Sequence, residues 1–272
     1  MKRSFGNLWR RNLAFFRLAV ISNLEYRLNF FADAVAQPAL ATFIEILLWM
    51  AIFASVGTDT IAGFPKDNYL AYVLWASFVG RVTSNWMYEF TMIEAIESGQ
   101  VNGMLVRPVS FFETYFSQFL GYKCATAFFS FLFPVAAAIV FDLPLIWTRI
   151  PGMLAIILFY LVFVHLMSFC VACLAFRLNK VWSFTVAKNL GLWIFTGELF
   201  PLDLFPEPWK QVMISLPFAN AVYTPVGYVT GRVGDDILLQ GFVSTFFGIV
   251  TLGLLARWMW RSGLKSYVGT GA

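Results

Sequence analysis

Six ionisable side chains lie within long apolar stretches of this sequence: Asp33, Glu45, Arg81, Glu89, Lys123 and Glu198. An ionised side chain at the centre of a bilayer costs about 2.5–3.5 kcal/mol on insertion scales, so each one requires a partner or a water-filled route. Asp33 and Glu89 are expected close to the inner membrane surface. Two interpretations remain for the others: Glu45 pairs with Arg81 or Lys123 and joins helices, or one of these residues lies on a polar route.

The residue types of an active site or a metal site are scarce. His165 is the only histidine and has no carboxylate three or four positions later, which favours a packed, neutral imidazole over a metal ligand or a catalytic base. All three cysteines, Cys124, Cys170 and Cys173, lie in apolar stretches, so we expect no disulfide framework. A phosphate-binding loop needs a Gly–Lys pair, which the sequence lacks.

The composition predicts an integral membrane protein. Hydrophobic residues make up 60% of the 272 positions and charged residues 12%, far from the balance of soluble domains. About 20 apolar helical residues cross a bilayer, and the sequence predicts six such helices. Continuous apolar runs such as 156–164 exclude the alternating pattern of a transmembrane barrel. The predicted spans are residues 32–56, 69–90, 112–141, 151–175, 182–200 and 237–258.

Basic residues gather on one side of these spans, which predicts that both termini are cytoplasmic. On that side we place Lys2, Arg3, Arg10, Arg11, Arg17, Arg27, Arg107, Arg177, Lys180, Lys188, Arg257, Arg261 and Lys265. The other side has Lys66, Arg149, Lys210 and Arg232. The net charge of +4 is therefore explained by the membrane topology and does not indicate nucleic-acid binding. Because charges recur through Arg27, we expect no cleaved signal peptide.

Residues 1–28 predict an amphipathic helix at the inner membrane surface. One face collects apolar residues, and the other repeats a basic residue every seven positions. Such a helix would contact membrane lipid, although a basic flank that only sets topology is equally compatible. The apolar face consists of Phe5, Leu8, Trp9, Leu13, Phe16 and Val20, and the basic repeat of Arg3, Arg10 and Arg17.

Residues 91–110 form the longest predicted cytoplasmic loop. Glu94 and Glu97 share a helical face, Gly99 and Gly103 can end short helical pieces, and Pro108 stops a helix. A short helix with exposed carboxylates suits docking to a cytoplasmic partner, whereas the composition alone favours an ordinary connecting loop.

The sequence of residues 198–230 predicts an unusual segment on the outer side of the membrane, between the last two spans. Its prolines forbid one straight helix, yet residues 211–227 are too apolar for a solvated loop. Short helices that fold partway back into the membrane satisfy both constraints.

Several of these elements together resemble the permease subunits of ABC type-2 exporters. Residues 197–201 read Gly–Glu–Leu–Phe–Pro, residues 202–206 Leu–Asp–Leu–Phe–Pro, residues 216–218 Leu–Pro–Phe and residues 105–110 Leu–Val–Arg–Pro–Val–Ser. The similarity extends over essentially the whole chain, residues 1–272, as a single permease domain. It is closest to small bacterial permeases that pair with a second, related permease and a separate ATPase.

The resemblance implies an all-α permease of the bacterial cytoplasmic (inner) membrane that exports an amphipathic or lipid-linked substrate. No cofactor is expected in this chain, since ATP and Mg²⁺ would bind the ABC ATPase subunits. Two permeases, identical or related, would form a dimer whose spans one, two and five line the route. The loop between spans two and three would be the coupling helix, with Glu94, Ile96, Glu97, Gly99, Gln100 and Arg107 contacting the ATPase.

The same resemblance implies a possible transport role for the charged residues inside the membrane. Glu45, Arg81, Lys123 and Glu198 are either interhelical ion pairs or residues of the transport route, where Arg81 would attract an anionic substrate group. Two other classes remain open from the sequence: an intramembrane lipid-modifying enzyme and an ATP-independent lipid scramblase. The scattered carboxylates disfavour the enzyme.

Overall fold

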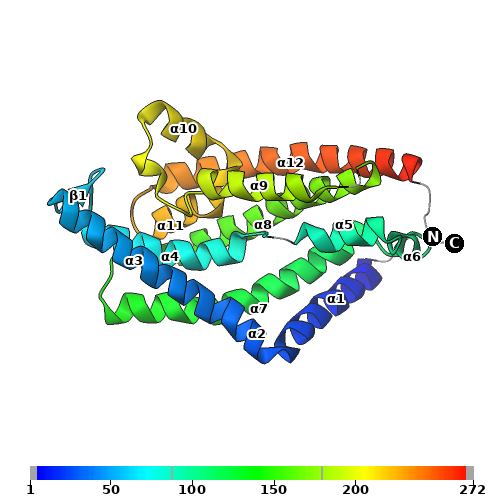
Figure 1. Ribbon diagram of the computed structural model, residues 1–272, viewed down its shortest axis with the longest axis horizontal. Helices are drawn as coiled ribbons and strands as arrows, with labels where there is room; N and C mark the ends of the chain where they lie inside the picture. The colour runs from blue at the N-terminus through cyan, green and yellow to red at the C-terminus, as the bar shows by residue number, and fades with distance from the viewer. Residues whose placement is uncertain (1–4, 87, 179, 268–272) are drawn as a thin grey trace.

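The computed structural model describes residues 5–86, 88–178 and 180–267 and is almost entirely helical (Figure 1). This confirms the predicted all-α class. The first half contains α1 (Phe5–Glu25), α2 (Arg27–Phe31), η1 (Ala32–Ala36), α3 (Gln37–Val56), β1 (Thr60–Ile61), β2 (Phe64–Pro65), α4 (Lys66–Thr83), α5 (Glu89–Glu97), α6 (Val101–Leu105) and α7 (Phe111–Val140). The second contains η2 (Trp147–Arg149), α8 (Ile150–Cys173), η3 (Leu174–Phe176), α9 (Trp182–Phe195), η4 (Leu202–Leu204), α10 (Glu207–Ser215), η5 (Pro217–Ala221), α11 (Tyr223–Val229) and α12 (Asp235–Ser266).

Four continuous helical stretches of the described chain are long and apolar enough to cross a membrane. They are Arg27–Val56, Phe111–Val140, Trp147–Phe176 and Asp235–Ser266. These four contain or closely match the first, third, fourth and sixth predicted spans. Crossing by the other two segments stays a prediction.

The second predicted span, 69–90, is not one helix, which corrects its boundaries. Helix α4 ends at Thr83, the backbone of Ser84 is extended, and the next helix begins at Glu89. Apolar composition alone does not predict this end. The contact that stabilises it comes from another helix, since the ammonium of Lys123 on α7 binds carbonyl groups at the end of α4. The fifth predicted span, 182–200, also ends early: α9 stops at Phe195, before Gly197 with its φ of +76°.

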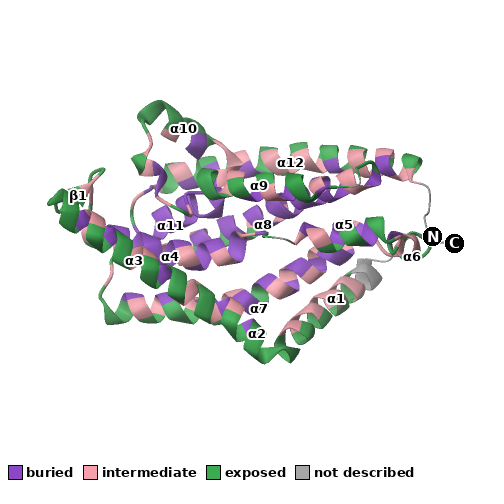
Figure 2. Ribbon diagram, viewed as in Figure 1, coloured by how far each residue is buried: buried purple, intermediate pink, exposed green. Residues whose placement is uncertain are grey.

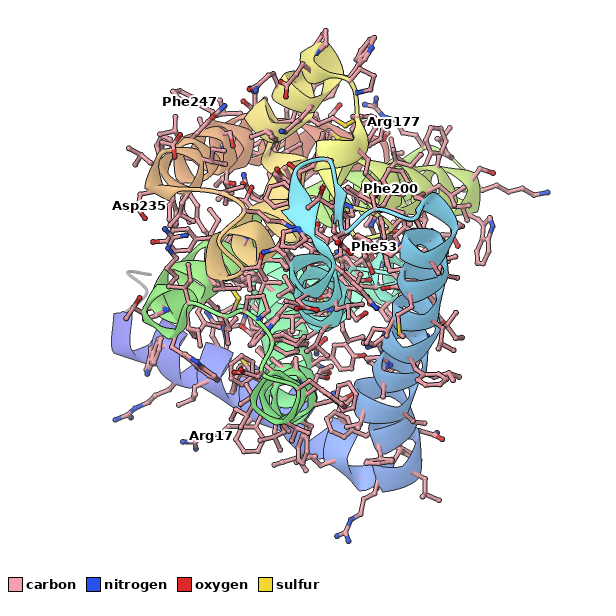
Figure 3. All side chains as sticks on the ribbon, turned by 90° about the vertical axis from the view of Figure 1, so that its left-hand side faces the viewer. Arg17, Phe53, Arg177, Phe200, Asp235 and Phe247 are labelled. Carbon is pink, nitrogen blue, oxygen red and sulfur yellow. The ribbon has the colours of Figure 1, made fainter. Side chains whose placement is uncertain are left out.

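Helix α8 is the centre of the bundle. It packs against α12, α4, α5 and α11, and most of its apolar window is buried. By contrast, few residues in the apolar windows of α3 and α12 are buried, and many of their apolar side chains are exposed (Figure 2). Seen from the β-hairpin end, Phe53 lies between α3 and α4, whereas Phe247 lies on the outer surface of α12 (Figure 3). The two peripheral helices therefore present apolar surface to lipid or to another chain.

The amphipathic N-terminal segment is helical, as predicted. Helix α1 lies along α7 and approaches it closely at Gly121, where a Cβ atom would be 2.6 Å from the carbonyl oxygen of Phe16. Trp9 remains exposed. Arg11, which is outside the basic repeat, forms an ion pair with Glu113 of α7. Lys2 and Arg3 lie outside the described residues.

The predicted inner and outer segments separate to opposite ends of the bundle. The beginning of α1, the end of α12 and the pair α5–α6 lie at one end, while the β1–β2 hairpin and α10 lie toward the other (Figure 1). The outer segment consists of short helices, as the prolines predict, and its α11 is largely buried. The depth of this segment in a membrane stays a prediction.

Candidate functional site

A polar cavity of about 340 Å³ lies between α3, α4 and α9. A second cavity, of about 620 Å³, lies around η1 and the end of α1, and the two share Gln37 as a lining residue. The first cavity is called the central cavity below. It is lined by Gln37, Pro38, Ala41, Glu45, Ser77, Arg81, Ser84, Trp86, Trp193 and Glu198.

Arg81 forms an interhelical ion pair, but with Asp33 and not with Glu45. The Tyr122 hydroxyl also donates a hydrogen bond to Asp33 and accepts one from Arg81 at 3.4 Å. The predicted pairing of Glu45 with Arg81 or Lys123 is therefore wrong. Asp33 and Arg81 link η1 to α4, and the Arg81 side chain still lines the central cavity.

Lys123 reaches from α7 to the end of α4. Its ammonium donates hydrogen bonds to the carbonyl oxygens of Arg81, at 3.0 Å, and of Ser84. These are carbonyl groups that the end of a helix leaves without partners, so the ammonium stabilises the termination of α4. Lys123 is buried and does not line the central cavity, which indicates a structural role.

Two carboxylates line the central cavity without an ion pair among the described residues. Glu45 accepts a long hydrogen bond from the Ser77 hydroxyl, at 3.5 Å. Glu198 lies against Gly80. A Cβ atom added at Gly80 would be 2.8 Å from the Oε1 atom of Glu198. Glycine at position 80 therefore makes room for this carboxylate. Both acidic groups can interact with a polar or cationic part of a molecule in the cavity.

An aromatic pair completes the wall of the central cavity. The rings of Trp86 and Trp193 stack with centroids 5.3 Å apart and an interplanar angle of 12°. Both side chains are also exposed. No specific signal in the sequence marks this pair, because ten tryptophans occur and interfacial anchoring accounts for most of them. Carboxylates, a guanidinium and stacked indoles in one cavity suit an amphipathic molecule.

Glu89 and Lys188 form a buried ion pair that is not apparent from the sequence. Lys188 Nζ lies 2.7 Å from Glu89 Oε1, and the exposed fractions of the two side chains are 7% and 0%. The Ser168 hydroxyl donates to Glu89 and accepts from Lys188, both at 3.2 Å. Glu89, expected close to the inner membrane surface, is therefore shielded from water within the protein, and Lys188, counted with the basic residues of the cytoplasmic side, lies inside α9. The pair connects the first residue of α5 to the middle of α9.

The segment 91–110 folds into α5 and α6 around Gly99, whose φ of +79° confirms its predicted role in ending a helix. Gly103 does not end one, since it lies inside α6. Ile96 is 1% exposed and packs in the core, while its predicted contact with an ATPase stays a prediction. The exposed residues of the predicted set are Glu94, Glu97, Gln100 and Arg107, and Gly99 is partly exposed.

His165, Cys170 and Cys173 are packing residues. The imidazole is fully buried among the rings of Tyr88, Phe112, Phe116 and Phe119. Cys170 and Cys173 are buried and Cys124 is exposed, all as free thiols. Within the described residues, no three His, Cys, Asp or Glu side chains are arranged to hold a metal ion.

A second cluster of charges, also not apparent from the sequence, fixes the outer segment. Arg232 is fully buried and donates to Asp203 at 2.9 Å. Its guanidinium lies over the rings of Phe64, Tyr69 and Tyr72, at 4.2, 4.3 and 5.1 Å from their centroids. These contacts tie the segment around α10 and α11 to the hairpin and α4.

Long apolar helices around a polar, aromatic cavity define the class as a multi-pass helical membrane protein. The family model for ABC-2 family transporter proteins matches residues 39–271, and the chain belongs to this family. It is therefore a membrane permease of the ABC transport type, which confirms the resemblance found in the sequence. Permeases of this family generally work with ABC ATPase partners and are not themselves catalytic. No curated protein matches the chain.

Proposed function

We propose that this permease exports an amphipathic or lipid-linked substrate through a route that includes the central cavity. The supporting observation is where the cavity walls come from: α3, α4 and α9 are the first, second and fifth predicted spans. The resemblance to exporters assigned the route to these three. The stacked Trp86 and Trp193 would contact apolar parts of the substrate, and Arg81, Glu45 and Glu198 its polar part.

A separate ATPase would dock on the α5–α6 segment. Glu94, Glu97, Gln100 and Arg107 are exposed there, and Val106 adds an apolar side chain that is 86% exposed. The opposite face of α5 is packed on α8 and η3. A displacement of α5 by the ATPase would therefore be passed to the bundle and, through Glu89 and Lys188, to α9 beside the cavity.

A second permease, identical or related, would cover the exposed apolar faces of α3 and α9. Phe43, Ile44 and Leu47 are exposed on α3, and Trp193 and Ile194 on α9. Both helices border the central cavity, so a partner placed here would close the route from the other side. The assembly would lie in the bacterial inner membrane with both termini cytoplasmic, as the distribution of basic residues predicts.

Charge reversal on α5 tests the docking. The full chain is expressed in its native host with an affinity tag, and nucleotide-binding proteins that copurify are identified and assayed for ATP hydrolysis. The double variant Glu94→Lys/Glu97→Lys should lose the ATPase. Glu207→Lys is the matched control, because Glu207 is an exposed carboxylate of α10 toward the other end of the bundle. Retention of the ATPase by the double variant would refute the docking site.

The assembled complex also tests the cavity. A photoreactive lipid phosphate incorporated into the same membranes should label peptides of α3, α4 and α9, and Trp193→Ala should reduce this labelling with the ATPase still bound. Labelling of the complex that avoids all three helices would contradict the proposed route.

A further inference from the structure

A separate cavity of about 450 Å³ lies at the α6 end of the bundle, between the beginning of α7, α8 and the last part of α12. It shares no lining residue with the central cavity. Its wall combines aromatic and small residues with two arginines, Arg107 and Arg257. The proposed transport route gives this cavity no role.

The floor of the cavity is apolar. The Trp260 ring stacks on Phe111 with centroids 5.0 Å apart and lies 5.5 Å from the ring of Phe169. On α12 the wall is formed by Gly253 and Ala256, and a Cβ atom built on Gly253 meets nothing within 4 Å. The missing side chain leaves open space along this part of the helix, where a hydrocarbon chain could lie.

The rim of the cavity is cationic. Arg107 and Arg257 are exposed, and neither guanidinium has an ion pair or a hydrogen bond within residues 5–86, 88–178 and 180–267. Arg11 and Arg81, in contrast, have carboxylate partners in Glu113 and Asp33. No acidic residue lines the cavity. Ser110, the residue that caps α7, also lines it, so the positive end of a 30-residue helix adds to the potential.

The surface beside the cavity is typical of a lipid-facing helix. Leu254, Leu255 and Trp258 of α12 are exposed by 67%, 40% and 61%. A water-soluble anion would leave the apolar hollow empty, whereas a phospholipid has both a phosphate for the rim and a hydrocarbon chain for the floor.

We propose that this cavity binds an anionic phospholipid of the inner leaflet. The phosphate would lie between Arg107 and Arg257, and an acyl chain would lie along Gly253 against Trp260 and Phe111. Placement in the inner leaflet follows from the predicted orientation of the chain. Because Arg257 is outside the α5–α6 segment, its replacement tests the lipid site without altering the proposed ATPase contacts.

The test uses the purified full chain in detergent with added dioleoyl phosphatidylglycerol or dioleoyl phosphatidylcholine. Bound lipid is counted by native mass spectrometry, and apparent Kd values are obtained by titration. Wild type should retain phosphatidylglycerol in preference to phosphatidylcholine. Arg257→Gln should weaken phosphatidylglycerol binding about fivefold, the effect of one arginine near an anionic headgroup, and leave phosphatidylcholine unchanged.

Gly253→Leu provides a second, independent variant. The added side chain enters open space, and leucine is the better helix former, so the protein should fold while binding of both lipids falls. Arg261→Gln is the matched control, one turn further along α12 and outside the cavity. The proposal is overturned if Arg257→Gln binds like wild type, if Arg261→Gln is weakened equally, or if inorganic phosphate alone displaces the lipid. Arg257→Gln should still copurify with the ATPase, which separates this result from failure of the docking proposal.

Discussion

Removing one member of the Glu89–Lys188 pair should destabilise the protein far more than removing both. The Glu89 side chain is fully buried and Lys188 is 7% exposed, so neither single variant lets water reach the charge that remains. Lys188→Met leaves an unpaired carboxylate beside Ser168, and Glu89→Gln leaves an unpaired ammonium. In the double variant no charge is buried at this site, and the glutamine introduced at position 89 can still accept a hydrogen bond from the Ser168 hydroxyl.

The expected magnitudes follow from this burial. Breaking a buried ion pair by removing one partner costs about 3–5 kcal/mol, whereas replacing both partners with neutral groups is often close to neutral. An exposed pair couples by only about 0.2–1 kcal/mol. We therefore expect a coupling free energy above about 2 kcal/mol between positions 89 and 188.

A double-mutant cycle measures this coupling. The free energy of unfolding is determined for wild type, both single variants and the double variant by titration with sodium dodecyl sulfate in dodecylmaltoside micelles. The control cycle uses Glu207→Gln and Lys210→Met, a pair on α10 at 3.5 Å in which Glu207 is 70% exposed. A coupling below about 1 kcal/mol for Glu89 and Lys188 would refute a water-excluded pair.

Two further predictions concern helix packing and the outer segment. Gly121→Val should push α1 away from α7 and destabilise the protein by about 1–3 kcal/mol, measured in the same micelles. Gly191→Val is the control, at a position with open space, and should destabilise the protein less. Equal effects of the two variants would contradict the close approach of α1 to Gly121. Arg232→Met should remove the guanidinium partner of the buried Asp203 and make the segment around α10 sensitive to low concentrations of protease. Lys210→Met removes a partly exposed partner 3.3 Å from Asp203 and should have the smaller effect. Unchanged proteolysis of Arg232→Met would contradict a stabilising role for the Arg232–Asp203 pair.

The sequence by itself determined the positions of four long apolar helices and one helix end, at Gly99. Hydrocarbon requires that the backbone satisfy its own hydrogen bonds, so long apolar runs such as those of α8 and α12 could be assigned as helices without a structure. The helix end at Gly99 and the short helices of the outer segment could be predicted in the same way. Glycine and proline act on the backbone of their own segment.

Tertiary structure decided which charged groups meet. The sequence indicated that Arg81 requires a partner, but Asp33 and Glu45 were equally available by composition, and only the crossing of η1 and α4 brings Asp33 to it. The sequence places Glu89 near a predicted span end and counts Lys188 among the basic residues of the cytoplasmic side, yet the two side chains meet in the interior. The end of α4 belongs to the same category, because an ammonium group from α7 binds the carbonyl groups there. Hydrophobicity is a property of each segment, whereas an ion pair or a helix end capped from another helix depends on distances between segments far apart in the chain.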